Sequence, residues 1–177
     1  MKQIIDTNVL LVANGMHGDV SSECISACVR KLAEIKNNGV VVLDDAYRIL
    51  KEYLLKTSPN QPKGVGDVFL KWLQQNLANN TCVETVAITE NLPDEFDEFP
   101  DAGLQQMFDP PDRKFVAVAN AHDEKPPILQ AADCKWLDWW QVLANNEIEV
   151  KFLCPNDVCR FYQNKFPRKP LPPLPSD

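Results

Sequence analysis

The amino-acid sequence predicts an α/β fold with a mainly parallel central sheet flanked by helices on both faces. Short apolar runs rich in β-branched residues alternate with longer segments whose apolar residues recur every three or four positions. Such alternation of strands and helices is typical of parallel sheets. The 177 residues, 45% hydrophobic and 24% charged, fit one globular domain. A chain of this length needs neither a metal nor a disulfide merely to fold.

The first predicted strand and the first long helix are separated by an apolar run. Lys2–Ile5 is expected to be a short strand, and the apolar run Val9–Ala13 precedes a glycine-containing loop. Ser21 or Ser22 can cap a helix that extends to about Lys36, where Asn-Asn-Gly ends it. The apolar positions of this helix, spaced by four, three and three residues, are Ile25, Val29, Leu32 and Ile35.

The next segments are predicted to be strand, helix, loop and helix. Val40–Leu43 is a continuous apolar run, typical of a strand buried on both faces. Asp44 or Asp45 caps the following helix. Thr57–Gly66 is a loop because it holds two prolines and two glycines, and Asp67 starts another helix. The apolar stripes of these two helices are Ala46, Ile49, Leu50, Tyr53 and Leu54, and Phe69, Leu70, Leu73 and Leu77.

An acidic segment follows the third predicted strand, Cys82–Thr89. Glu90–Pro111 is expected to be a long loop because four prolines lie among its carboxylates. Between Trp72 and Asp112 there is no Lys or Arg, and this stretch holds nine of the 25 acidic residues. The net charge of −7 is therefore local, and the rest of the chain can tolerate a phosphate backbone. Residues 90–101 are expected to lie outside any nucleic-acid groove and to offer a docking surface for a basic partner.

The last third of the chain resumes the alternation and ends in a tail. Asp112 caps a helix that carries Phe115, Val116 and Ala119. Residues 1–166 are expected to form a single domain, and residues 167–177 an extended proline-rich tail whose pattern fits SH3 ligands. The remaining predicted elements are the strand Ile128–Ala132, the helix Trp136–Leu143, the strand Glu147–Leu153 and the helix Asp157–Lys165.

Carboxylates stand where the strands of the predicted sheet end. Asp6 ends the first strand, and Asp133 follows Ile128–Ala132. Asp112 opens a helix, and Glu52 lies in the helix after the second strand. Ligands of parallel sheets bind beyond the carboxyl ends of the strands, so these four acids can face one crevice. A helix that starts at Asp45 would place this residue on the same face as Glu52.

Four carboxylates in one crevice need a counter-charge. Two charges about 5 Å apart repel by roughly 3 kcal/mol at an effective dielectric of 20. The acids must therefore be protonated, pair with cations or bind a metal. Oxygen ligands suit a hard divalent ion, so Mg²⁺ or Mn²⁺ is the expected cofactor.

The order of these acids resembles that of the PIN-domain nucleases. The resemblance rests on Ile4-Ile5-Asp6-Thr7-Asn8, on Glu52, on the segment from Asp112 to Ala119, and on Ala132-Asp133-Cys134-Lys135-Trp136. It spans about residues 1–154. In that family the last motif often has a second Asp, whereas this chain has Lys135 at that position.

The resemblance implies metal-assisted hydrolysis of a phosphodiester, with RNA favoured over DNA as the substrate, as in toxin- or defence-type enzymes. Asp6, Glu52, Asp112 and Asp133 would hold the metal. Asn8 would orient Asp6 or contact phosphate. The alternative is a catalytically weak PIN-like module that binds a protein partner through residues 90–101 or the proline-rich tail.

Other functions and sites find little support. There is no P-loop, no GxGxxG and no nucleophile elbow, and neither His17 nor His122 is assigned a role. No apolar stretch reaches membrane-spanning length and the N-terminus does not fit a signal peptide, so no membrane contact and a cytoplasmic location are expected. The six cysteines lack paired CxxC spacing and are expected to be reduced and mostly buried.

Overall fold

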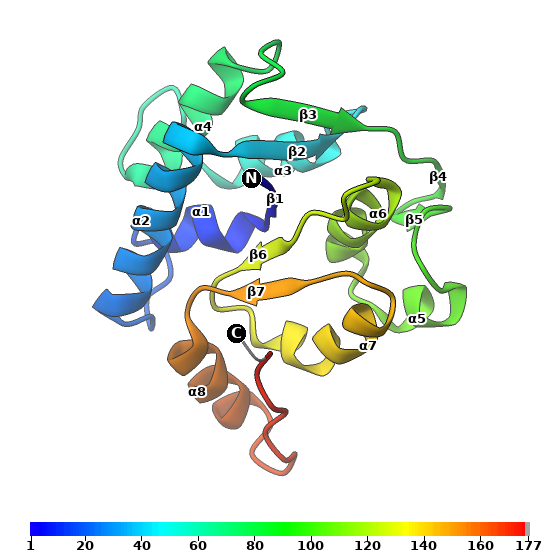
Figure 1. Ribbon diagram of the computed structural model, residues 1–177. Coiled ribbons are helices and arrows are strands. Elements are labelled where there is room, and N and C mark those ends of the chain that lie inside the picture. The colour runs from blue at the N-terminus through cyan, green and yellow to red at the C-terminus, as the bar shows by residue number, and fades with distance from the viewer. Residues whose placement is uncertain (176–177) are drawn as a thin grey trace.

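The computed structural model describes residues 1–175, and its centre is a five-stranded parallel sheet of order β3-β2-β1-β6-β7. Figure 1 shows these strands in that order from top to bottom. The predicted α/β class is confirmed, and the five predicted strands are those that form the sheet. Three of them are shorter than predicted. The strands are β1 (Lys2–Ile5), β2 (Val40–Asp44), β3 (Val83–Val86), β6 (Ile128–Gln130) and β7 (Val150–Phe152).

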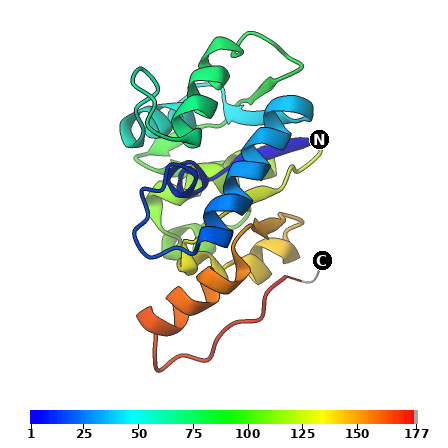
Figure 2. The same cartoon turned by 90° about the vertical axis from the view of Figure 1, so that its left-hand side faces the viewer.

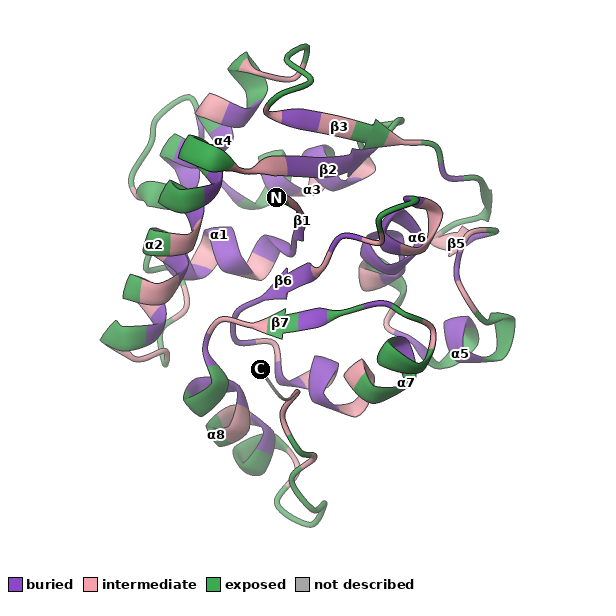
Figure 3. Cartoon of the chain, viewed as in Figure 1, coloured by how far each residue is buried: buried purple, intermediate pink, exposed green. Residues whose placement is uncertain are grey.

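Both faces of the sheet are covered. Ile4 and Ile5 point to opposite faces of β1, as successive strand residues do, and both are fully buried. Helices α1 (Thr7–Ala13), α2 (Ser22–Asn38) and α4 (Val65–Gln75) pack against one another, while α6 (Arg113–Ala121) contacts β1, β2 and β6. In Figure 3 the central strands β1, β2 and β6 are mostly buried, while exposed residues lie on the edge strands β3 and β7, the outer helix faces and the loops.

Two N-caps fix the start of the first helices. The carboxylate of Asp6 accepts from Asn8 N, which turns the apolar run after the first strand into α1. Ser21 Oγ accepts from Cys24 N and caps α2, which confirms one of the two predicted caps, Ser21 or Ser22. The chain therefore enters a helix directly from β1, and Asp6 is held at that junction.

Helix α3 (Arg48–Lys56) begins later than predicted. The carboxylate of Asp44 accepts from Arg48 N and Ile49 N, so Asp44 stabilises the start of the helix. Asp45 is exposed in the turn before it. The expectation that Asp45 shares a helix face with Glu52 is therefore wrong, because Asp45 is not part of the helix.

Helix α4, in contrast, starts two residues earlier than predicted, at Val65, and Asp67 lies inside its first turn. The Asp67 carboxylate accepts from the backbone N–H groups of Ser58 and Lys63 and from Asn14 Nδ2. Asp67 thus holds the preceding loop in place.

The long acidic loop predicted over Glu90–Pro111 is instead mostly structured. It contains the antiparallel pair β4 (Glu90–Leu92) and β5 (Glu95–Phe96), helix α5 (Ala102–Met107) and the 3₁₀ turn η1 (Pro110–Asp112). The Gln105 side chain accepts from Phe96 N and donates to Phe96 O. The apolar residues between the acids, Phe96, Phe99, Leu104 and Phe108, are buried and anchor the segment.

The predicted helix Trp136–Leu143 is two shorter elements, the 3₁₀ helix η2 (Cys134–Asp138) and α7 (Trp140–Asn145). Helix α8 (Pro155–Lys165) starts two residues before the predicted Asp157. Residues 170–175 form no helix or strand, and Trp140 Nε1 donates to Pro173 O over 2.9 Å. Residues 176–177 of the predicted tail lie outside the described part of the chain.

Candidate functional site

The candidate site lies where the two central strands β1 and β6 end. Asp6 directly follows β1, and Asp133 comes three residues after β6 and caps η2. Asn8 Oδ1 accepts from Ala132 N over 2.8 Å and so links the two strand ends. The predicted supporting residue Asn8 therefore ties the segment that follows β1 to the segment that carries Asp133.

Asp6 is the most buried of the four acids, with 5% of its surface exposed. Burial raises the pKa of the Asp6 carboxyl well above its ordinary value, and the charges of Asp112, Asp133 and Glu52 raise it further. The hydrogen bond from Asn8 N opposes this rise. The other three predicted acids are thus all within electrostatic reach of Asp6.

Asp112 occupies the N-cap position of α6, but its side chain makes no capping hydrogen bond. The predicted capping role is therefore wrong, and the carboxylate is available to the site. Burial, followed by the charges of Asp133 and Asp109, raises the pKa of Asp112 to about 7. Lys114 acts in the opposite direction and lowers it.

Glu52 lies in α3, and both of its carboxylate oxygens are engaged. Thr7 Oγ1 donates to Oε1 over 2.5 Å, and Lys114 Nζ lies 2.5 Å from Oε2. Thr7 follows Asp6 directly, so α1, α3 and α6 meet at this carboxylate. Sequence analysis assigned no role to Thr7 or Lys114. The signal for Lys114 was a lysine two residues after Asp112, just before an otherwise apolar run.

The carboxylate oxygens of the four acids are the kind of ligand that a hard divalent cation prefers, but the distances between them limit how many could bind one ion. Among residues 1–175, no three Asp, Glu or His ligand atoms lie within 4.8 Å of one another. Ligands of one Mg²⁺, bound at about 2.1 Å, are separated by no more than about 4.2 Å. Mg²⁺ commonly takes one or two carboxylates and keeps several waters. An ion at these acids would therefore be held directly by at most two of them, with water completing its coordination.

A cleft of about 760 Å³ adjoins this site and shares Asn8 and Asp133 with it. Its walls carry Lys135, Arg160 and Lys165 together with the acids Asp19 and Asp133, and Arg160 pairs with Asp157. Lys135 Nζ pairs with the Asp109 carboxylate at the site's edge. Lys135 thus places a cation beside Asp133 and pairs with a neighbouring acid.

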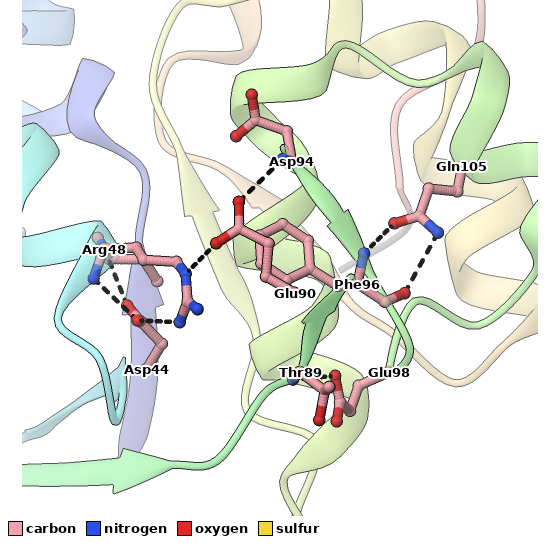
Figure 4. A network of polar contacts seen from close by, with 9 residues as sticks. Asp44, Arg48, Thr89, Glu90, Asp94, Phe96, Glu98 and Gln105 are labelled. Atoms are coloured by element: carbon pink, nitrogen blue, oxygen red, sulfur yellow. Dashed lines mark hydrogen bonds and ion pairs between the residues drawn. The ribbon is translucent and has the colours of Figure 1, made fainter. Parts of the chain in front are cut away.

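The acids of residues 90–101 are bound differently. Arg48 Nε donates to Glu90 over 2.7 Å, and Glu90 also accepts from Asp94 N over 3.0 Å (Figure 4). These contacts lower the pKa of Glu90, the bond from Asp94 N contributing most. Thr89 N donates to the Glu98 carboxylate. The segment is a hydrogen-bonded hairpin whose carboxylates face solvent or pair locally.

The cysteines differ from the prediction. Cys24 in α2 and Cys154 before α8 form a disulfide across 130 residues, so the expectation of reduced thiols is wrong for this pair. Cys28 remains a buried free thiol whose pKa burial raises to about 12, and its Sγ lies 3.9 Å from that of Cys154. Figure 2 shows the start of α2 beside α8. Sequence spacing gave no signal for a pair so far apart in the chain.

Comparisons with known proteins give no family for this chain. No protein-family model matches it, and searches of the curated proteins and of the solved structures found no match. Within residues 1–175 no helix is long and apolar enough to cross a membrane.

Proposed function

We propose that this protein is a divalent-metal-dependent nuclease that hydrolyses phosphodiester bonds, in RNA more readily than in DNA. The observation that carries the proposal is the effect of Asp112, Asp133 and Glu52 on the buried Asp6 at the end of β1, with the pKa values of Asp6 and Asp112 both raised. Buried carboxylates with raised pKa values in a cleft are typical of functional sites. The preference for RNA and a toxin- or defence-type role rest on the resemblance to PIN-domain nucleases.

In this proposal Asp6, Glu52, Asp112 and Asp133 hold Mg²⁺ or Mn²⁺, directly or through water. When bound, such an ion lowers the pKa of a coordinated water and neutralises charge on the phosphate. Asn8 keeps the Asp6 and Asp133 segments in register through its bond to Ala132 N. The adjoining cleft receives the phosphate backbone.

The cationic side chains of that cleft would contact the phosphate backbone of the nucleic acid. Lys165 and Arg160 lie on α8 and Lys135 follows Asp133. A backbone that crosses these cations comes to Asp133, which lines the same cleft, and positive charge beside a negatively charged site helps a phosphate backbone to approach. The acidic hairpin repels phosphate and leaves the cleft as the approach.

The test is cleavage of single-stranded RNA, structured RNA and DNA, with Mn²⁺ and with chelator. Metal-dependent cleavage that Asp6→Asn removes, in a variant that still folds, supports the proposal. Cleavage that persists in chelator contradicts it.

A second candidate is a PIN-like module that binds a protein partner and does not cleave. Two observations favour it: no three of the site's ligand atoms lie within 4.8 Å of one another, and Lys114 already neutralises Glu52. The partner would dock on residues 90–101 or on the proline-rich tail proposed for residues 167–177. Metal binding without cleavage of any nucleic acid would select this candidate.

A further inference from the structure

We propose that Lys114 is the site's built-in cation: its ammonium group neutralises Glu52 in the metal-free protein, competes with a divalent metal and moves away when one binds. The inference rests on the proposed metal site and names the residue that sets the affinity of that site for the metal.

The position of Lys114 is unusual for a lysine. It is the second residue of α6 and is only 6% exposed. Lysines are almost never this buried unless they are paired. Its partners are Glu52 Oε2 at 2.5 Å and the carbonyl oxygen of Pro111, and the ammonium lies 4.9 Å from the centre of the Phe115 ring. The side chain thus points across from α6 to α3.

The contacts of Glu52 show why metal and lysine compete. One carboxylate oxygen is taken by Thr7 Oγ1 and the other by Lys114 Nζ. A metal that binds Glu52 directly must displace one of these donors. The ammonium also acts on Asp112, so a divalent ion bound to Asp112 would meet a like charge nearby. Keeping both cations in the site is unfavourable.

The structure also offers a destination for the displaced ammonium. A hollow of about 320 Å³ is lined by Lys114 and Glu52 and also by Glu90 and Asp94 of the acidic hairpin. The charge of Lys114 already acts on Glu90. A rotation of the flexible lysine chain toward Glu90 would keep the ammonium near a carboxylate while it vacates the site. The acidic hairpin would then support the site without binding metal itself.

The experiment measures Mn²⁺ affinity by calorimetry for four full-length proteins. Lys114→Met keeps most of the unbranched side chain and removes the charge, while Lys114→Arg keeps the charge. Lys151→Met removes the same charge from exposed β7 and serves as the matched control. Lys114→Gln replaces Lys114→Met if the methionine variant does not fold.

Lys114→Met is expected to bind Mn²⁺ at least about tenfold more tightly than the wild type, because a like charge leaves the site. Lys114→Arg and Lys151→Met should stay within about threefold. Without metal, Lys114→Met should melt at a lower temperature than the wild type, and Mn²⁺ should restore more of its stability.

The outcomes separate the two proposals. If wild type and Lys114→Met bind Mn²⁺ equally, or the variant binds more weakly, Lys114 is not a competing cation although the metal site stands. If none of the proteins binds Mn²⁺, the metal site itself is rejected, and the competition with it.

Discussion

Two acid-rich regions of this molecule lie close together and behave in opposite ways. In the candidate site, burial and the charges of neighbouring acids raise the pKa values of Asp6 after β1 and of Asp112 before α6. In the hairpin of β4 and β5, hydrogen bonds from Asp94 N and Arg48 lower the pKa of Glu90. Residues 90–101, which include this hairpin, hold six acids against the four of the site, yet their charges are solvated or paired. Unsatisfied buried charge, and not acid content, therefore distinguishes a candidate site from a charged surface.

The largest expected effect is on turnover. Asp6→Asn and Asp112→Asn should each reduce Mn²⁺-dependent cleavage by at least about 100-fold, because each removes a charge that helps hold the metal. The matched control neutralises Asp94, Glu95, Asp97 and Glu98 together and should change the rate by less than about threefold. Initial rates on one RNA substrate measure both. Equal losses in the site and hairpin variants would erase the distinction between the two regions.

Metal-induced stabilisation should also distinguish the regions. Mn²⁺ at 100 times its Kd should stabilise the folded protein by about 2.7 kcal/mol and raise the Tm by roughly 5–10 °C. Asp6→Asn should lose most of this shift, and the hairpin variant should keep it. Thermal unfolding with and without Mn²⁺ measures the shift. If millimolar Mn²⁺ leaves the Tm of the wild type unchanged, the proposal of a metal site is wrong.

The pH dependence of stability should follow Asp112. Its pKa is about 7 in the folded protein and near 3.8 when unfolded, so the folded state binds more protons between these values. The wild type should therefore lose stability from this group as the pH rises from about 4 to 7. Asp112→Asn abolishes that loss and should stabilise the metal-free protein by about 2 kcal/mol at pH 8. At pH 4 the difference should vanish, which urea unfolding at both pH values tests.

The smallest expected effect is that of Glu90→Gln on stability, and its sign should be opposite to that of Asp112→Asn. Glu90 has a lowered pKa when folded, so its contribution to stability is present above about pH 4.5 and is lost as the pH falls below it. Glu90→Gln should therefore destabilise the protein at pH 7, by about 0.5 kcal/mol because the pair with Arg48 is largely exposed. Urea unfolding compared with Asp112→Asn measures it. If both substitutions stabilise the protein, the carboxylates of the two regions contribute to stability in the same way and the comparison fails.

Local sequence determined the framework. Apolar runs such as Val40–Leu43 specify strands buried on both faces, and the alternation with helical patterns predicts the parallel sheet that is observed. The serine cap of α2 was also predictable. Because parallel strands end at one edge of the sheet, the proximity of Asp6 and Asp133 followed from the sequence as well.

Tertiary structure decided the chemistry around those acids. Glu52 meets Thr7 and Lys114 only because α1, α3 and α6 converge, and no local pattern encodes such contacts. The Cys24–Cys154 disulfide joins residues 130 positions apart for the same reason. Asp112 fits the pattern of a cap, yet its carboxylate is left to the site by the 3₁₀ turn before α6. Periodicity and caps depend on neighbours along the chain, whereas charge compensation depends on neighbours in space.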